Sequence, residues 1–129
     1  EKYQGIAPPA ERGEEYCDAC SKTHINNDPA QYYDYAISNV LLFQFHEYIA
    51  KNILKQDPHA TNYHGNKEIG EFVKKLMYPG ANVDWQNHLE ENLSTGMSAN
   101  AMKAYFAPLM DYLKTVNNGR TYTLPEQIM

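Results

Sequence analysis

The sequence has few cysteines, no long apolar run and no excess of positive charge. Its most apolar stretch, residues 35–50, is interrupted by polar side chains and is shorter than the roughly 20 residues of a membrane-spanning helix. The net charge is −5 and the basic residues are scattered, which argues against a nucleic-acid partner. The opening Glu-Lys-Tyr-Gln-Gly resembles neither part of a signal peptide. We therefore expect no membrane span, nucleic-acid partner or secretion signal in this sequence.

The two cysteines, Cys17 and Cys20, form a single Cys-x-x-Cys motif. A structural zinc site needs a second pair of ligands, which this motif lacks. A redox motif of this type is expected at a helix start after a strand, and no strand pattern precedes Cys17. We interpret the pair as inert loop thiols or a local disulfide, with a metal or redox role as the alternative.

The apolar periodicity predicts an all-α chain of irregularly arranged helices. Residues 1–27 are rich in Pro, Gly, Glu and Asn and are expected to form an extended loop. Asp28, Pro29 and Gln31 together resemble a helix start, which predicts a helix over about 28–54. This helix is apolar on nearly every side, so it should be buried on several faces. We expect some of its partners to come from outside this chain, or from self-association.

Three further helices are predicted, over about 67–78, 84–93 and 99–117. Asp84 and Ser98 are the expected N-caps of the second and third. Pro108 should kink the last helix, and Asn117-Asn118-Gly119 should end it. Residues 120–129 are expected to form a frayed tail, so the predicted helical region spans 28–119 of one partial domain.

Four side chains near the start of the first long helix could carry chemistry: Lys22, His24, Tyr32 and Tyr35. A loop next to a helix N-terminus favours anion capture, which suits the lysine and the histidine. The ordinary alternatives are a solvated lysine, a loop histidine and two core tyrosines. No acidic or thiol nucleophile accompanies the four. They can bind a carboxylate and stabilise an oxyanion, but they cannot cut a bond by themselves.

The segment His46-Glu47-Tyr48-Ile49-Ala50 begins like the zinc signature His-Glu-x-x-His. That signature needs two histidines four residues apart, so that both face one ion. Alanine occupies position 50, so we expect no metal site here. A buried or half-buried histidine on a packed helix is the interpretation we prefer.

Several short motifs share their order and spacing with one family. They are Lys2-Tyr3-Gln4-Gly5-Ile6, Pro8-Pro9, Asp18-Ala19, Lys22-Thr23-His24, Phe43-Gln44-Phe45-His46-Glu47 and Tyr105-Phe106-x-Pro108. From residue 2 to about 117 the chain resembles the angiotensin-converting-enzyme family of zinc peptidyl-dipeptidases, near their C-terminus. The resemblance implies the C-terminal part of a larger α-helical metallopeptidase, which we expect to be bacterial. Zinc is then a cofactor of the whole enzyme, and its ligands lie upstream of residue 1.

The resemblance also implies roles for the four side chains. Lys22 and Tyr32 would bind the free C-terminal carboxylate of a peptide substrate, and His24 would bond to the backbone of the departing dipeptide. Tyr35 would donate its hydroxyl to the oxyanion. Counting back from Phe43 gives these tyrosines, whereas counting forward from Lys22 is off by one, which leaves Tyr33 as the alternative.

Two departures from the family pattern are visible. Asp34 stands where chloride-activated members carry a chloride-binding arginine, so chloride dependence is doubtful. Residues 48–51 lack the cysteine that animal members carry, so that disulfide is absent. Family members are commonly secreted, periplasmic or membrane-anchored facing outward, and we expect the same location. The alternative function is a non-catalytic helical interaction module.

Overall fold

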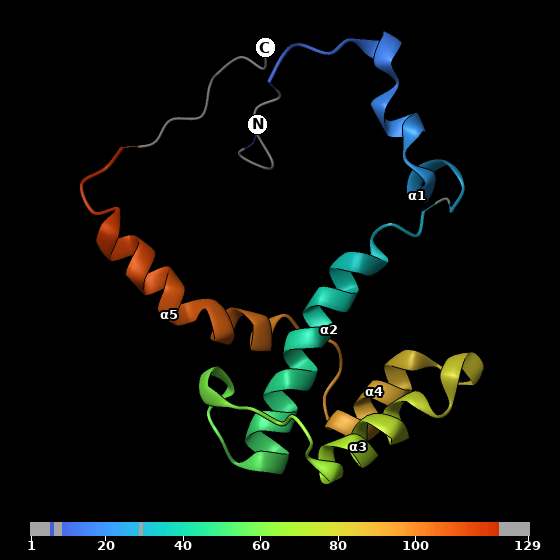
Figure 1. Cartoon of the computed structure of the whole chain (residues 1–129), viewed down its shortest axis with the longest axis vertical. Helices are drawn as coiled ribbons and strands as arrows, with labels where there is room; N and C mark the ends of the chain where they lie inside the picture. The colour runs from blue at the N-terminus through green and yellow to red at the C-terminus, as the bar shows by residue number, and fades with distance from the viewer. Residues whose placement is uncertain (1–5, 7–8, 29, 122–129) are drawn as a thin grey trace. The chain divides into compact units, whose positions relative to one another are not determined.

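The computed structural model describes residues 6, 9–28 and 30–121, and their regular structure is helical throughout, which confirms the all-α prediction (Figure 1). The chain divides into two compact units. The first contains residues 1–34 and 112–129, and the second contains residues 35–111. Each unit is described by itself below.

The N-terminal part of the first unit is not the extended loop that its composition predicts. It contains 3₁₀ turns at Glu14–Tyr16 and Asp18–Ser21, and the short helix α1 at Thr23–Asn26. Local backbone bonds hold these turns; the Cys20 N–H, for example, donates to the Cys17 carbonyl at 2.9 Å. A stretch without a sheet or long helix must satisfy its polar backbone groups locally, and short turns achieve this.

The first long helix, α2, spans Asp34–Tyr48 and continues as a π-helical segment, Ile49–Leu54. The predicted start at Asp28 is wrong because Ala30 has a φ of +60°, which a right-handed helix cannot include. Pro29, part of the predicted start signal, lies outside the described residues. The helical segment ends at Leu54 as predicted, with Lys55 at a φ of +56° after it.

Helices α3 (Lys67–Met77) and α4 (Trp85–Leu93) lie within 35–111, the second unit, and both start at capping side chains. Asn66 accepts from the Ile69 N–H at 3.2 Å, and Asp84, as predicted, accepts from the Asn87 N–H at 2.9 Å. The Tyr48 and Phe72 rings stack with their centroids 5.3 Å apart and so join α2 to α3. The ribbons of these two helices are neighbours in Figure 1. The buried apolar residues form a small core: Ile49, Ala50, Ile69, Leu89, Leu93 and Ala101.

Helix α5 spans Asn100–Val116 and includes Pro108. The Ser98 side chain binds a backbone group at the start of this helix, because its Oγ accepts from the Asn100 N–H at 3.2 Å. Its end is also local: Gly119 has a φ of +78°, a conformation that suits glycine. None of the described helices is both long and apolar enough to cross a membrane.

Gln44 is a buried polar side chain that ties α2 to the segment before α5. Its Nε2 donates to the Gly96 carbonyl at 2.8 Å, and its Oε1 accepts from the Ser98 N–H at 3.1 Å. Only 5% of the residue is exposed, so water cannot replace these partners freely. One side chain therefore satisfies two backbone groups from more than 50 residues away.

We expect Gln44→Leu to lower the free energy of unfolding by about 1–3 kcal/mol, because it leaves the half-buried Gly96 carbonyl and Ser98 N–H without their partner. Urea denaturation followed by circular dichroism measures this. Gln86→Leu, at an exposed position of α4, is the matched control and should change stability by less than about 0.5 kcal/mol. Equal stability of the Gln44 variant and the wild type would contradict the bridging role.

Candidate functional site

Three of the four predicted site residues lie together in the first unit. The Lys22 Nζ is 5.9 Å from the centroid of the Tyr32 ring. The His24 ring centroid is 5.2 Å from that of Tyr32, with the two rings tilted by 48°. The structure thus brings a cation, an imidazole and a phenol into one cluster.

Local geometry explains how residues ten apart in sequence meet. Lys22 is the extended residue just before α1, and His24 lies within its single turn. Ala30, at its left-handed φ, redirects the chain after α1, and Tyr32 follows in a turn before α2. The chain therefore folds back and places Tyr32 against the α1 turn.

The cluster is open to solvent in this chain. Lys22 is exposed, His24 is half-buried, and 48% of Tyr32 is exposed. Lysine offers three N–H donors and a full charge, and the phenol and imidazole add further hydrogen-bonding groups. Such a set can hold a carboxylate by charge-assisted hydrogen bonds.

Tyr35 lies in the first turn of α2 and belongs to the second unit. Of Tyr32, Tyr33 and Tyr35, it alone is helical, because α2 starts at Asp34. The helix predicted over about 28–54 would include both Tyr32 and Tyr35, whereas Tyr32 lies before α2. Ala30, with its left-handed φ, excludes a helix start at Asp28. Tyr35 is 57% exposed, which leaves its ring accessible.

An ion pair fixes the turns that precede Lys22. The Arg12 Nε and Nη2 donate to the two carboxylate oxygens of Asp18 at 2.8 and 2.7 Å. The same guanidinium carbon lies 4.1 Å from the Tyr16 ring centroid. These hydrogen bonds lower the pKa of Asp18 and raise that of Arg12. The bidentate geometry gives the N-terminal turns a defined shape.

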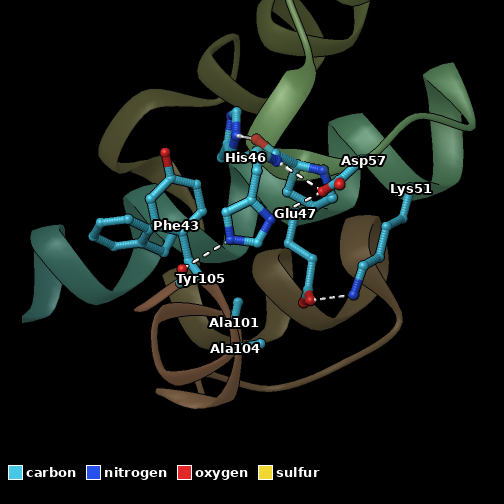
Figure 2. A pocket seen from close by; sticks show the side chains of 10 residues that line it. Phe43, His46, Glu47, Lys51, Asp57, Ala101, Ala104 and Tyr105 are labelled. Carbon is cyan, nitrogen blue, oxygen red and sulfur yellow. Dashed lines mark hydrogen bonds and ion pairs between the residues drawn. The ribbon is translucent and has the colours of Figure 1, made fainter. Parts of the chain in front are cut away.

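A separate cavity of about 230 Å³ lies in the second unit (Figure 2). The rings of Phe43 and Tyr105 form one wall, and the ion pair between Glu47 and Lys51, at 2.6 Å, lies on the other side. The lining residues are Phe43, His46, Glu47, Lys51, Asp57, Pro58, His59, Ala101, Ala104 and Tyr105.

Two histidines clamp the loop that borders this cavity. The His59 Nε2 donates to the Tyr105 carbonyl at 2.8 Å, and its Nδ1 bonds to an Asp57 carboxylate oxygen at 2.9 Å. The carbonyl and the ionised carboxylate both accept, so an imidazolium with a proton on each nitrogen satisfies both partners. The Tyr105 carbonyl and then Asp57 raise the pKa of His59. The backbone N–H of His59, and then its ring, lower the pKa of Asp57.

His46, the first residue of the zinc-like segment, is part of the same clamp. Its Nε2 donates to the Pro58 carbonyl at 2.7 Å. Glu47 is paired with Lys51, one helical turn away. Across the part of the chain that the structure describes, no group of three or more His, Cys, Asp or Glu side chains could hold a metal ion. These residues therefore do not fit a zinc site.

We expect the His59–Asp57 pair to make stability depend on pH. The raised pKa of His59 gives stabilisation that is complete below its unfolded pKa of 6.5 and is lost as pH rises through the folded value. The lowered pKa of Asp57 gives stabilisation present above its unfolded pKa of 3.8 and lost as pH falls through the folded value. The pair therefore stabilises most between these two unfolded values.

Urea unfolding at about pH 5.5 and about pH 8.5 tests this expectation. The stability difference between wild type and His59→Gln should shrink at the higher pH. His64→Gln, which alters an exposed loop histidine, is the control. A His59→Gln difference that is identical at both pH values would show that the imidazolium form does not stabilise the fold.

Sequence reasoning missed this clamp, although part of its signal is local. Asp57-Pro58-His59 is a turn in which the aspartate side chain accepts from the His59 N–H. The partner, Tyr105, is 46 residues away, in the turn of α5 before Pro108. The His59 ring donates to the Tyr105 carbonyl there, and no local sequence pattern predicts this contact.

Comparison with known proteins places the chain in a family. Residues 1–124 match the model of the angiotensin-converting enzyme family. The angiotensin-converting enzyme of Theromyzon tessulatum is 41% identical over 115 residues, which cover 86% of this chain and 18% of that protein. Those of Mus musculus and Bos taurus are 36% and 35% identical over 129 residues, covering 97% of this chain and 10% of each protein.

The chain thus spans less than a fifth of the length of these relatives. The family match nevertheless covers nearly all of it, including the Lys22–His24 segment and the tyrosines before α2. On this evidence, the chain belongs to the angiotensin-converting enzyme family.

Proposed function

We propose that this chain is the C-terminal part of a zinc peptidyl-dipeptidase, which releases dipeptides from the C-termini of peptides. In this proposal the chain supplies contacts to the substrate carboxylate and the oxyanion, but not the zinc site. The observation that carries it is the cluster of Lys22, His24 and Tyr32, within a chain that matches the family.

The carboxylate of the substrate would bind to Lys22 and Tyr32. The ammonium group neutralises the carboxylate, and the phenol adds a directional hydrogen bond. A site that holds the chain end sets the cleavage position by distance from that end. His24, beside Tyr32, would bond to the backbone of the two-residue leaving portion.

Tyr35 would act on the scissile bond itself. When a peptide carbonyl becomes tetrahedral, negative charge develops on its oxygen, and a positioned hydroxyl stabilises that charge. The hydroxyl matters least in the ground state, where the carbonyl oxygen carries little charge. Tyr35 is therefore the proposed catalytic residue of this chain, with Tyr33 as the alternative register.

In the proposal, the zinc site is formed by the rest of the polypeptide and not by this chain. The described residues here do not fit a metal site, because the His46 and Glu47 side chains bond within the fold. As the family resemblance implies, the zinc ligands of the whole polypeptide would lie upstream. Chloride binding next to Asp34 is not part of the proposal, since a carboxylate repels an anion.

The partners of this chain, in the proposal, include the upstream part of the same polypeptide. Large apolar side chains are exposed on the helices, among them Leu42 at 59% and Met77 at 73%. Burial of such surface stabilises by about 25 cal/mol per Å². The isolated chain should therefore self-associate, and a monodisperse monomer in analytical ultracentrifugation would contradict this.

We further propose a location outside the cytoplasm or facing outward from a membrane, as is common in the family.

Hydrolysis of an N-blocked tripeptide tests the function. The whole polypeptide should release the C-terminal dipeptide, whereas the isolated 129-residue chain should release none, with or without added zinc. Release by the isolated chain would contradict the proposal that the zinc site lies outside this chain. No release by the zinc-loaded whole polypeptide would favour a non-catalytic helical interaction module.

A further inference from the structure

Cys17 and Cys20 lie in one tight turn of the first unit. The Cys20 N–H donates to the Cys17 carbonyl at 2.9 Å, and the Ser21 N–H reaches the same oxygen at 3.3 Å. A turn closed in this way holds its first and fourth Cα atoms within about 7 Å. Disulfides join Cα atoms about 4.4–6.8 Å apart, so the backbone here is compatible with a bond between the two sulfurs.

The neighbours of the turn hold it in this shape. Asp18, the residue after Cys17, is fixed by the two hydrogen bonds from Arg12. The Asn26 side chain of α1 donates to the Cys20 carbonyl, which ties the turn to the helix that carries His24. Closing a disulfide in a turn that is already ordered costs little further conformational entropy.

Both thiols are free and exposed, so reagents in solution can reach them. A hydrogen bond to Cys17 raises the pKa of Cys20. This hydrogen bond places the two sulfur atoms side by side, so a mixed disulfide formed at Cys17 lies within reach of the Cys20 sulfur. Within the described part of the chain, no third His, Cys, Asp or Glu joins them to form a metal site, so redox chemistry fits better than metal binding.

We propose that Cys17 and Cys20 form a redox-active dithiol site that exchanges with small-molecule disulfides of the glutathione type. The Cys17 thiolate attacks one sulfur of the small disulfide, forming a mixed disulfide and releasing one small thiolate. The Cys20 thiolate then attacks the Cys17 sulfur and releases the second, which takes up a proton. The protein is oxidised by two electrons, and the small disulfide is reduced to two thiols. The site stands independently of the peptidase proposal.

The sequence offers a direct readout, because trypsin cuts after Arg12 and Lys22 and so releases both cysteines in peptide 13–22. The whole polypeptide is equilibrated in buffers of increasing oxidised-to-reduced glutathione ratio, trapped with an alkylating reagent, digested and analysed by mass spectrometry. The peptide should pass from two alkyl groups to none, with loss of two hydrogen masses. The midpoint should not change with protein concentration, since the bond is intramolecular.

Cys20→Ser separates the two exchange steps. It should stop at a single glutathione adduct on Cys17, because the resolving thiol is missing. Wild-type peptide that stays doubly alkylated at every ratio, or that carries two glutathiones, would overturn the proposal. Cross-linked dimers through position 17 or 20 in place of the internal bond would overturn it as well.

Discussion

Replacing Tyr35 by phenylalanine should lower kcat of the whole enzyme by about 10²–10³-fold, the typical loss for one oxyanion-hole donor. The change removes one hydroxyl and keeps the ring, so packing at this exposed position should be preserved. Because the hydroxyl acts mainly in the transition state, KM should change little. Steady-state kinetics on a free-acid peptide measures both constants.

Tyr33→Phe is the matched control, because it removes the same hydroxyl two residues earlier in the chain. Tyr33 is exposed and precedes α2, and we expect near wild-type kcat for this variant. If Tyr33→Phe abolished turnover while Tyr35→Phe did not, the register of the assignment would be wrong.

Replacing Lys22 by methionine should raise KM for free-acid peptides by roughly 10- to 150-fold. This range corresponds to the loss of a hydrogen bond to a charged group, about 1.5–3 kcal/mol. The contact exists in both the ground and the transition state, so kcat should fall much less. The prediction depends on the cluster geometry, in which the Lys22 ammonium lies beside the Tyr32 ring.

A C-terminally amidated peptide provides the decisive comparison for Lys22. It lacks the negative charge, so wild type and Lys22→Met should process it with similar, poor efficiency. Lys103→Met, at an exposed position of α5, controls for the loss of one surface charge. An unchanged KM for the free-acid peptide in the Lys22 variant would show that Lys22 does not bind the substrate carboxylate.

Helix boundaries were predictable from sequence where the stop and start signals are local. The Asp84 cap and the stop at Leu54 each depend on residues within a few positions, and both appear in the structure. The start of α2 was not predictable, because the signal at Asp28 looks complete in sequence. The helix does not start there because Ala30 has a left-handed backbone conformation. Glycine, asparagine and aspartate commonly adopt this conformation, but alanine does not, so the sequence gives no sign of it.

The candidate site was likewise predictable from sequence only in part. Lys22, His24 and Tyr32 were identified through a motif resemblance, since composition alone leaves them as ordinary surface residues. Their meeting depends on the fold of the chain between α1 and α2, which only the structure shows. The buried bridge of Gln44 and the clamp of His59 join residues about 50 positions apart. Such long-range pairs are set by tertiary packing, which local patterns do not contain.

The position of the cut is the most direct test of the account, because a carboxylate-holding site fixes cleavage by distance from the chain end. The zinc-loaded whole polypeptide is incubated with a peptide of about ten residues, and the first products are identified by mass spectrometry. The account predicts a C-terminal dipeptide as the first product from a free-acid peptide and a strong loss of this product on amidation. Release of single amino acids, internal cleavage independent of the chain end, or equal cleavage of the amide would contradict it.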